Sequence, residues 1–232
     1  MKLSTIAKTS LALGILTTGV MTTYAQSADA EVQASVQTKI STEDLKTYYT
    51  KKPFELRDVK GDRNGDKVTV IDKGIQTDID LLGNDKQRVN EEFLKSKIDV
   101  FVVGEGTSKQ ATINSIGGIT KTNSKDFIDH VIKAPLTIVK KEGEFTFSNG
   151  LTPFEIKKEE ISLKELDFKL RKQLIKDHGL YSGDKKGGTI VVKMNGEEKD
   201  KYTFELDKKL QDHRMGDVVD SKNIKEIIVE MK

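Results

Sequence analysis

The sequence predicts a mostly β protein with a few α-helices, an α+β chain of two domains. Three observations lead to this prediction. Short runs of alternating apolar and polar residues, separated by turn residues, recur along the chain and indicate β-strands. One long helical pattern follows Ser162, and the strand pattern restarts near Lys133-Ala134-Pro135. A chain of 232 residues also has room for two small domains.

The first 30 residues are expected to be a secretory signal peptide and not part of the fold. Two early lysines precede an apolar core, Leu11 to Met21, and residues 28–30 (Ala-Asp-Ala) form a small-residue cleavage site. This core is shorter than the roughly 20 residues that span a membrane. We therefore expect an exported, soluble, extracellular protein whose mature chain begins near Glu31, with residues 31–40 as a flexible lead-in.

Residues 41–133 are predicted to form a small Greek-key β-barrel. Ser41 or Thr42 can cap a short helix, Glu43 to Tyr49, that ends before Pro53. Turn residues such as Asn64-Gly65 then separate five strand-like runs. These runs are Phe54–Val59, Lys67–Ile71, Ile75–Leu82, Ile98–Val103 and Gln110–Ile119.

Residues 134–232 are predicted to form a β-grasp-like domain, in which a long helix separates two strands from three more. The predicted strands are Leu136–Lys140, Glu144–Ser148, Gly188–Met194, Lys201–Leu206 and Ile224–Glu230. No internal repeat and no low-complexity tract interrupts this pattern.

The predicted helix has a clear start and one apolar stripe. Ser162 and Glu165 form a capping box, which satisfies two amide donors at the helix start. Leucines then recur at helical spacing, at positions 163, 166, 170 and 174. Asp167 and Arg171 lie one turn apart beside this stripe, as an ion pair. We expect this pair to hold the fold together; the alternative is a latch between the domains.

Composition excludes several classes of function. The chain has no cysteine, which removes disulfides, thiol catalysis and cysteine metal sites, and fits a bacterial exported protein. Its formal net charge of +2 is not that of a nucleic-acid-binding domain. Phosphate-loop and nucleophile-elbow motifs are absent. We therefore expect a binding protein, not an enzyme, with no cofactor, no nucleic acid and no membrane insertion.

Two groups of residues have only a weak similarity to metal sites. The segment Asp58–Asp66, "DVKGDRNGD", has its glycine at the wrong position for a calcium loop and lacks the final glutamate, so it predicts a hairpin turn. The histidines at 130, 178 and 213 are far apart in the sequence and form no zinc-binding pair.

The segment Lys158–Tyr181, "KEEISLKELDFKLRKQLIKDHGLY", resembles the second signature of the staphylococcal and streptococcal superantigen toxins. "SIGGITKTN", Ser115 to Asn123, resembles the first signature, although Ile116 replaces the usual tyrosine and the spacing is shorter. With no cysteine and with the start "MKLSTIAKTSLALGILTTG", the chain is similar to the staphylococcal superantigen-like branch. That resemblance implies an N-terminal OB-fold, a C-terminal β-grasp domain, no catalysis and interference with host innate immunity.

One subgroup of that branch binds sialylated, fucosylated Lewis-type glycans through a pattern like "TFELxKKLQxxRMxD", which this chain matches from Thr203 to Asp217. The resemblance implies a glycan site formed by Thr203, Glu205, Lys209, Gln211, Arg214 and Asp217. These residue types suit a sialoglycan. The carboxylate of sialic acid accepts from a guanidinium and a hydroxyl, and sugar hydroxyls both donate and accept.

Three functions are open at this point. The first is a lectin that coats sialylated glycoproteins on neutrophils, monocytes or platelets and blocks adhesion or signalling, with a homodimer made plausible by the resemblance. The second is a module that captures a host receptor, immunoglobulin or complement protein through the OB domain or the surface between the domains. The third is a true T-cell superantigen, which the missing cysteine loop and missing zinc pair disfavour.

Overall fold

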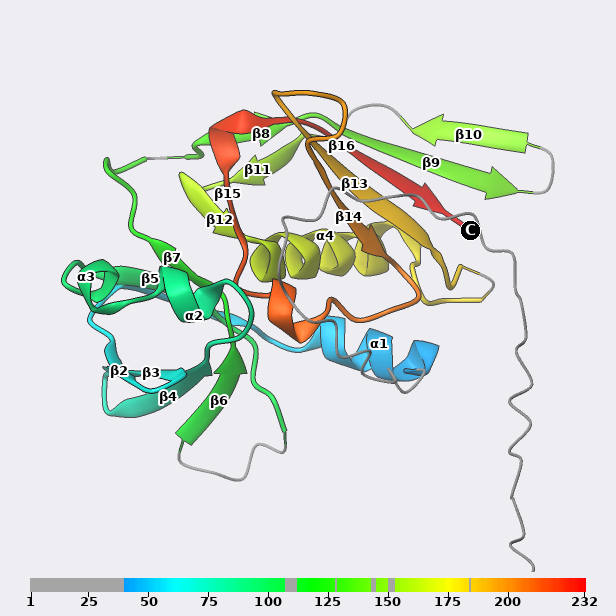
Figure 1. Ribbon diagram of the computed structural model, residues 1–232. Helices are drawn as coiled ribbons and strands as arrows, with labels where there is room; N and C mark the ends of the chain where they lie inside the picture. The colour runs from blue at the N-terminus through cyan, green and yellow to red at the C-terminus, as the bar shows by residue number, and fades with distance from the viewer. Residues whose placement is uncertain (1–39, 107–111, 128, 143–144, 150–152, 184) are drawn as a thin grey trace, which may run out of the picture. The chain divides into compact units, whose positions relative to one another are not determined.

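The structure is a computed structural model that describes residues 40–232, apart from 107–111, 128, 143–144, 150–152 and 184 (Figure 1). The predicted signal peptide and almost all of the lead-in lie outside the described residues. Within the described ranges, the helices are all too short or too polar to cross a membrane.

The N-terminal region runs from the first helix to β7 and contains two sheets. One has the strand order β1-β5-β7 and is antiparallel. The other has the order β2-β3-β4-β6, in which β4 and β6 are parallel. In the described residues the strands thus form two open sheets and no closed ring, so the prediction of a closed Greek-key barrel is wrong in its closure: no strand pairing joins the two sheets. The elements are α1 (Thr42–Thr50), β1 (Phe54–Val59), β2 (Asp62–Asn64), β3 (Lys67–Asp72), β4 (Ile75–Asp80), α2 (Asp85–Arg88), α3 (Glu91–Leu94), β5 (Ile98–Val102), β6 (Thr112–Ile116) and β7 (Ile119–Lys121).

Local signals explain two of these elements. The Ser41 side chain caps α1 by accepting a hydrogen bond of 3.1 Å from the amide of Asp44, as predicted. The turn at Asn64-Gly65 joins β2 to β3, with Asn64 opposite Lys67 and Gly65 at a φ of 61°. The segment "DVKGDRNGD" therefore contains a hairpin, which confirms the prediction.

The predicted strand Gln110–Ile119 is wrong as a single element, because Gly117 and Gly118 divide it into β6 and β7. Both glycines have positive φ, 52° and 84°, which a strand cannot continue through. A Cβ on Gly118 would lie 2.5 Å from the carbonyl oxygen of Phe101, so only glycine fits there. Residues 110 and 111 lie outside the described residues.

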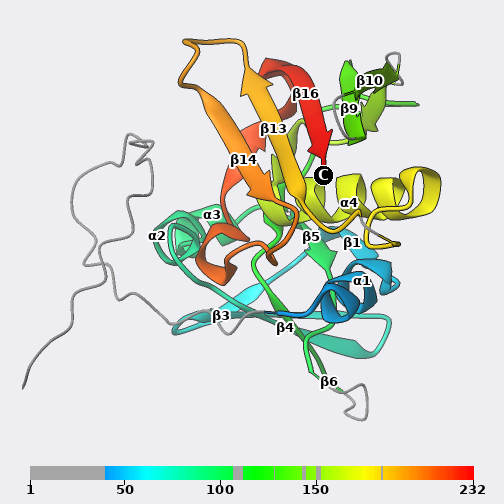
Figure 2. The ribbon, with the colours of Figure 1, turned by 90° about the vertical axis from the view of Figure 1, so that its right-hand side faces the viewer.

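The C-terminal region is built on a five-stranded sheet with the order β10-β9-β16-β13-β14 (Figure 2). Strands β9 and β16 pair in parallel and the other pairs are antiparallel. Two small ladders, β8 with β11 and β12 with β15, complete the region. The elements are β8 (Ile132–Ala134), β9 (Leu136–Glu142), β10 (Phe145–Asn149), β11 (Phe154–Ile156), β12 (Glu160–Ser162), α4 (Leu163–His178), β13 (Gly188–Met194), β14 (Lys201–Glu205), η1 (Asp212–Arg214), β15 (Val218–Asp220), η2 (Ser221–Asn223) and β16 (Ile224–Met231).

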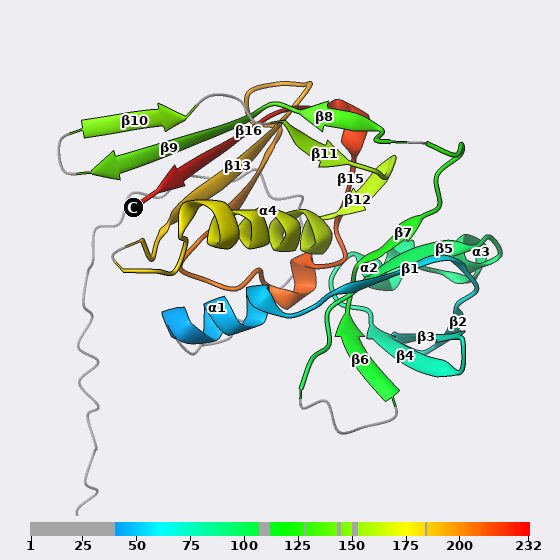
Figure 3. The ribbon, with the colours of Figure 1, turned by 180° about the vertical axis from the view of Figure 1, so that it is seen from behind.

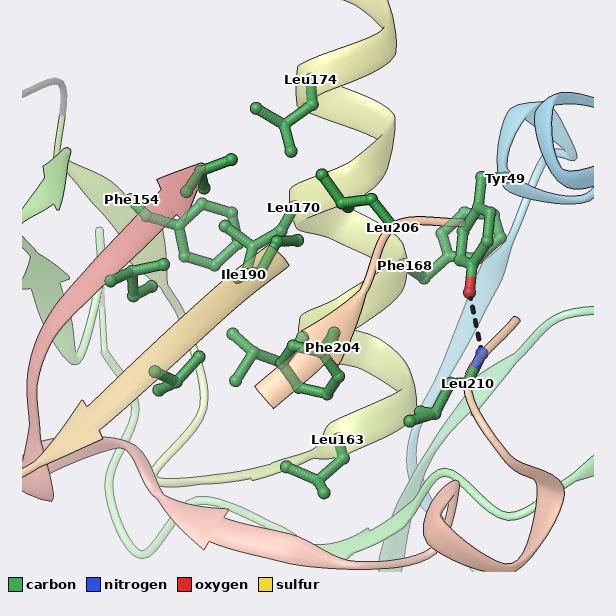
Figure 4. Packing of buried hydrophobic residues seen from close by; sticks show 14 of the residues in the cluster. Tyr49, Phe154, Leu163, Phe168, Leu170, Leu174, Ile190, Phe204, Leu206 and Leu210 are labelled. Atoms are coloured by element: carbon green, nitrogen blue, oxygen red, sulfur yellow. Dashed lines mark hydrogen bonds between the residues drawn. The ribbon is translucent and has the colours of Figure 1, made fainter. Parts of the chain in front are cut away.

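Helix α4 lies against this sheet, and its apolar stripe forms the centre of the larger core (Figures 3 and 4). The four leucines at 163, 166, 170 and 174 are buried, as their spacing predicts. Ser162 caps the helix through the amide of Glu165, at 3.1 Å. The Glu165 carboxylate instead accepts from Lys158 at 2.8 Å and Lys169 at 2.6 Å. This differs from the expected capping box, because two ammonium groups compete for the same oxygens.

Aromatic side chains of the N-terminal region also enter this core. Tyr49 of α1 and Phe101 of β5 lie on Phe168 of α4, with ring centroids 5.6 and 5.7 Å apart. The Lys164 ammonium of α4 donates to the Ser115 hydroxyl and to the Ile116 carbonyl, both at 2.7 Å. The two regions are therefore joined by buried contacts.

Candidate functional site

The predicted glycan site lies on strand β14 and the segment after it. Strand β14 ends the five-stranded sheet and pairs only with β13, where Thr203 lies opposite Val191. Because side chains alternate along a strand, Tyr202 and Phe204 face the core, while Thr203 and Glu205 share the other face. Thr203 is half-buried and Glu205 is exposed.

The segment Leu206–Asp217 (here the glycan loop) is held by buried apolar residues between its polar ones. Leu206, Leu210 and Met215 are buried in the larger core. The short 3-10 turn η1 brings Arg214 back over Gln211, with a backbone hydrogen bond of 2.9 Å between the two residues. With these anchors in place, the Arg214 side chain lies against β14.

Arg214 is the centre of the arrangement. Its Nη1 atom donates to the Gln211 side chain at 3.1 Å, and both Nη atoms donate to the Thr203 carbonyl oxygen at 3.3 Å. Its guanidinium also lies over the Phe204 ring, 5.8 Å from the centroid. A guanidinium has five donor hydrogens, and these contacts use three. The remaining two can meet an anionic oxygen.

Glu205, Lys209 and Asp217 each have a partner other than Arg214. Glu205 pairs with Lys208 on the exposed side of the strand. Lys209 lies 3.4 Å from the Glu105 carboxylate and 4.4 Å from the centroid of the Tyr48 ring. Asp217 accepts a hydrogen bond from the Asn84 amide at 2.9 Å. Thus Arg214 contacts both Gln211 and the Thr203 backbone, while Lys209 and Asp217 contact the N-terminal region.

The buried ion pair of α4 contacts the end of the same strand from the core side. Arg171 and Asp167 lie 2.7 Å apart and are both almost fully buried. Arg171 also donates to the carbonyl oxygens of Glu205, at 3.0 Å, and Leu206, at 3.1 Å. Tyr181 donates to the Leu206 carbonyl at 2.6 Å. The end of β14 is therefore bonded to the centre of the core.

The electrostatic environment is mixed. Burial raises the pKa of Tyr202, and the carboxylates of Asp217 and Asp200 raise it further, against the opposing effect of Arg214. A phenol with a raised pKa stays protonated at neutral pH, and Tyr202 packs against the core on the face of β14 opposite Thr203 and Glu205. The part of the chain that the structure describes contains no group of three or more His, Cys, Asp or Glu side chains placed to hold a metal ion.

Sequence reasoning missed the residues of the N-terminal region that border the site. Asn84 and Glu105 lie more than 100 positions before their partners, and no local pattern connects them. A separate hollow of about 590 Å³, lined by Arg88, Phe93, Lys121 and Glu160 among others, also had no sequence signal. None of the six predicted glycan residues lines it.

Comparisons with known proteins match both regions of the fold. Residues 43–123 match the family model of the staphylococcal superantigen-like OB-fold domain. Residues 134–231 match the model of the staphylococcal/streptococcal toxin β-grasp domain. Superantigen-like protein 11 of Staphylococcus aureus (strain Newman) is 46% identical over 231 residues, which cover 100% of both chains.

Two similar solved structures contain a glycan. The staphylococcal superantigen-like protein SSL5 complexed with sialyl Lewis X superposes with a TM-score of 0.71 at 36% identity, covering 83% of this chain and 100% of that one. A superantigen-like protein from Staphylococcus aureus, also in complex with sialyl Lewis X, has a TM-score of 0.70 at 38% identity, covering 83% and 99%. Both domain models and these matches confirm the predicted OB-fold and β-grasp classes.

Proposed function

Because this chain belongs to the staphylococcal superantigen-like family, we propose that it is a secreted protein that binds sialyl Lewis X-type glycans on host cells. The glycans would be those of glycoproteins on neutrophils, monocytes or platelets, and their occupation would block adhesion or signalling. The observation that carries the proposal is the Arg214 centre: a guanidinium that donates to the Gln211 side chain and to the Thr203 carbonyl oxygen on strand β14.

Each proposed contact has a chemical role. Arg214 and the Thr203 hydroxyl would bind the sialic acid carboxylate, with a charge-assisted hydrogen bond contributing about 1.5–3 kcal/mol. Glu205 and Asp217 would accept from sugar hydroxyls, whereas Gln211 and Lys209 would donate to them. One such shallow site binds weakly, but a homodimer on a dense glycan surface would raise avidity about 10²–10⁴-fold.

Two substitutions test the site directly. We expect Arg214→Gln to weaken binding of the sialyl Lewis X tetrasaccharide by about 10- to 100-fold, because one charge-assisted hydrogen bond is lost. Thr203→Val, which keeps the side-chain shape, should weaken it by about 3- to 10-fold. Titration calorimetry measures both. Lys225→Gln, which removes an exposed charge on β16, is the control and should bind like the wild type.

Cells provide the second arm of this test. Sialidase treatment of neutrophils should abolish staining by the wild-type protein, and Arg214→Gln should stain untreated cells as weakly as the wild type stains treated ones. If Arg214→Gln retained full affinity while its thermal melt was unchanged, the glycan site would be wrongly placed.

A second function, capture of a host protein by the N-terminal region, is favoured by one observation. Ile71 and Ile75 flank the β3–β4 turn and are 70% and 50% exposed, the two most exposed large apolar side chains described. Binding to cells that survives sialidase and is lost in Ile71→Ser/Ile75→Ser would indicate this function. Loss of all binding on sialidase treatment would exclude it for those cells.

A further inference from the structure

The glycan loop packs against helix α2 of the N-terminal region, and glycines on both sides allow the close approach. Gly83, just before α2, lies so close to the loop that a Cβ there would be 2.3 Å from the His213 carbonyl oxygen. Its φ of 57° also favours glycine. The next residue, Asn84, donates to Asp217 at 2.9 Å. Backbone and side chain of the loop are thus both contacted from this segment.

The Asp85–Arg88 ion pair of α2 contacts Gly216 of the loop. The Arg88 Nη2 atom donates to Asp85 at 2.6 Å, to the Ile119 carbonyl at 2.7 Å and to the Gly216 carbonyl at 3.2 Å. A Cβ at Gly216 would lie 1.8 Å from the Asp85 carboxylate, so that carboxylate fills the space of the missing side chain. Both regions therefore depend on each other's geometry here.

This contact has a cost. Asp85 is fully buried, and among the described residues its second carboxylate oxygen has no hydrogen-bond partner. Burial raises the pKa of Asp85, although Arg88 opposes the shift. An unsatisfied buried oxygen destabilises the fold, so its presence needs an explanation. The close contact between the Asp85 carboxylate and the loop backbone at Gly216 supplies that explanation.

The other part of the loop is held from the N-terminal region as well. The Leu210 amide donates to the Tyr49 hydroxyl at 3.2 Å (Figure 4). The Gly118 amide donates to the Met215 carbonyl at 3.2 Å, and Lys209 pairs with Glu105. The loop is therefore fixed along most of its length by residues outside the β-grasp sheet.

We propose that the N-terminal region positions the glycan site, with Asn84, Asp85 and Arg88 holding the loop in the conformation that presents Gln211 and Arg214. This inference rests on the proposed function for its ligand and adds that the site is incomplete in the β-grasp domain alone. The bonds from Arg214 to the Thr203 carbonyl are long, 3.3 Å each, so the place of the guanidinium depends on the loop. A loop that is already ordered in the free protein loses less conformational entropy when the glycan binds. The affinity is therefore higher than for a loop that must become ordered on binding.

The test compares variants of the full chain. Asn84→Ala removes an exposed side chain, and Asp85→Asn/Arg88→Met removes both charges together so that neither is left buried alone. Lys97→Met is the matched control, because it removes a positive side chain of the N-terminal region whose partner, Asp58, is exposed. Each protein is assayed for binding of the sialyl Lewis X tetrasaccharide, for its urea midpoint and for amide hydrogen exchange.

We expect about threefold weaker binding for Asn84→Ala and about tenfold for the double variant, with faster exchange confined to residues 207–217. Amide exchange in β13 and β16 should stay at wild-type values, and so should the urea midpoint of Asn84→Ala. A general loss of stability would change both. Lys97→Met should match the wild type throughout. Wild-type exchange in residues 207–217 of both variants would overturn the proposal, as would wild-type affinity.

The outcomes also separate this inference from the proposed function. If the wild type itself does not bind the tetrasaccharide, the proposed function fails, and the exchange measurement still decides whether α2 holds the loop. If the wild type binds and the variants bind equally well, the positioning role fails while the glycan site stands.

Discussion

Lys164 is one of the residues that join the two regions, and it does so at the cost of a buried charge. Its side chain is 2% exposed, and burial lowers its pKa to about 7 from an ordinary value near 10.5. The other charges that act on it are Glu105, Asp212 and Asp85, which raise the pKa, and Lys209, which lowers it. At pH 7 the folded protein thus holds an amine close to its own midpoint of titration.

Stability should therefore rise with pH in a defined window. Between pH 7 and 10.5 the unfolded chain binds the Lys164 proton and the folded chain does not, so raising the pH favours folding. From pH 7 to 9 the wild type should gain about 2 kcal/mol in its free energy of unfolding relative to Lys164→Met. Urea titrations at both pH values measure this. Lys95→Met, which removes an exposed lysine, should leave the wild-type pH slope unchanged; an equal slope in Lys164→Met would contradict the pKa assignment.

At the scale of elements, α4 organises the C-terminal region through its apolar stripe and its ion pair. The leucines pack under the sheet, while Arg171 reaches past them to bind Asp167 and the backbone at the end of β14. Tyr49 donates to the second oxygen of Asp167 at 2.6 Å, so the pair also contacts α1. The same two residues thus hold α4 against the end of β14 and also contact α1. The sequence had suggested these two roles, an ion pair that holds the fold and a latch between the domains, as alternatives.

Breaking this pair from one side should be strongly destabilising. Arg171→Met leaves the Asp167 carboxylate buried without its cation and should lower the free energy of unfolding by about 3–5 kcal/mol. Asp167→Asn/Arg171→Met should cost less, because no lone charge remains buried. Lys193→Met breaks the more exposed pair with Glu226 and should cost at most about 1 kcal/mol. Urea unfolding gives all three values; a loss below about 1 kcal/mol for Arg171→Met would rule out this role.

At the scale of the whole molecule, the buried contacts between the regions favour unfolding as one unit. Tyr49, Lys164 and Arg88 each bond across from one region to the other. We expect the amide signals of β3 and of β13 to disappear at the same urea concentration in a nuclear magnetic resonance titration. Midpoints that differ by about 1 M or more would show two independent domains. This contrasts with the weakly coupled domains that small polar interfaces allow.

The sequence by itself determined the elements whose signals are local. The cap at Ser41, the turn at Gly65, the leucine stripe of α4 and the alternation of β14 all depend on neighbours within a few residues, so periodicity and turn chemistry suffice to find them. The six predicted glycan residues were named in another way, from the resemblance of the segment between Thr203 and Asp217 to a family pattern, and they stay a prediction.

Only the tertiary structure decided what those residues touch. That Arg214 is held by the Thr203 backbone, Asp217 by Asn84 and Gly216 by Asp85 depends on packing between segments up to 133 positions apart. Short elements such as β8, β11, β12 and β15 also escaped prediction, because three residues carry too little periodicity and are stabilised by their partners alone. Contacts made across the fold leave no mark in a local pattern.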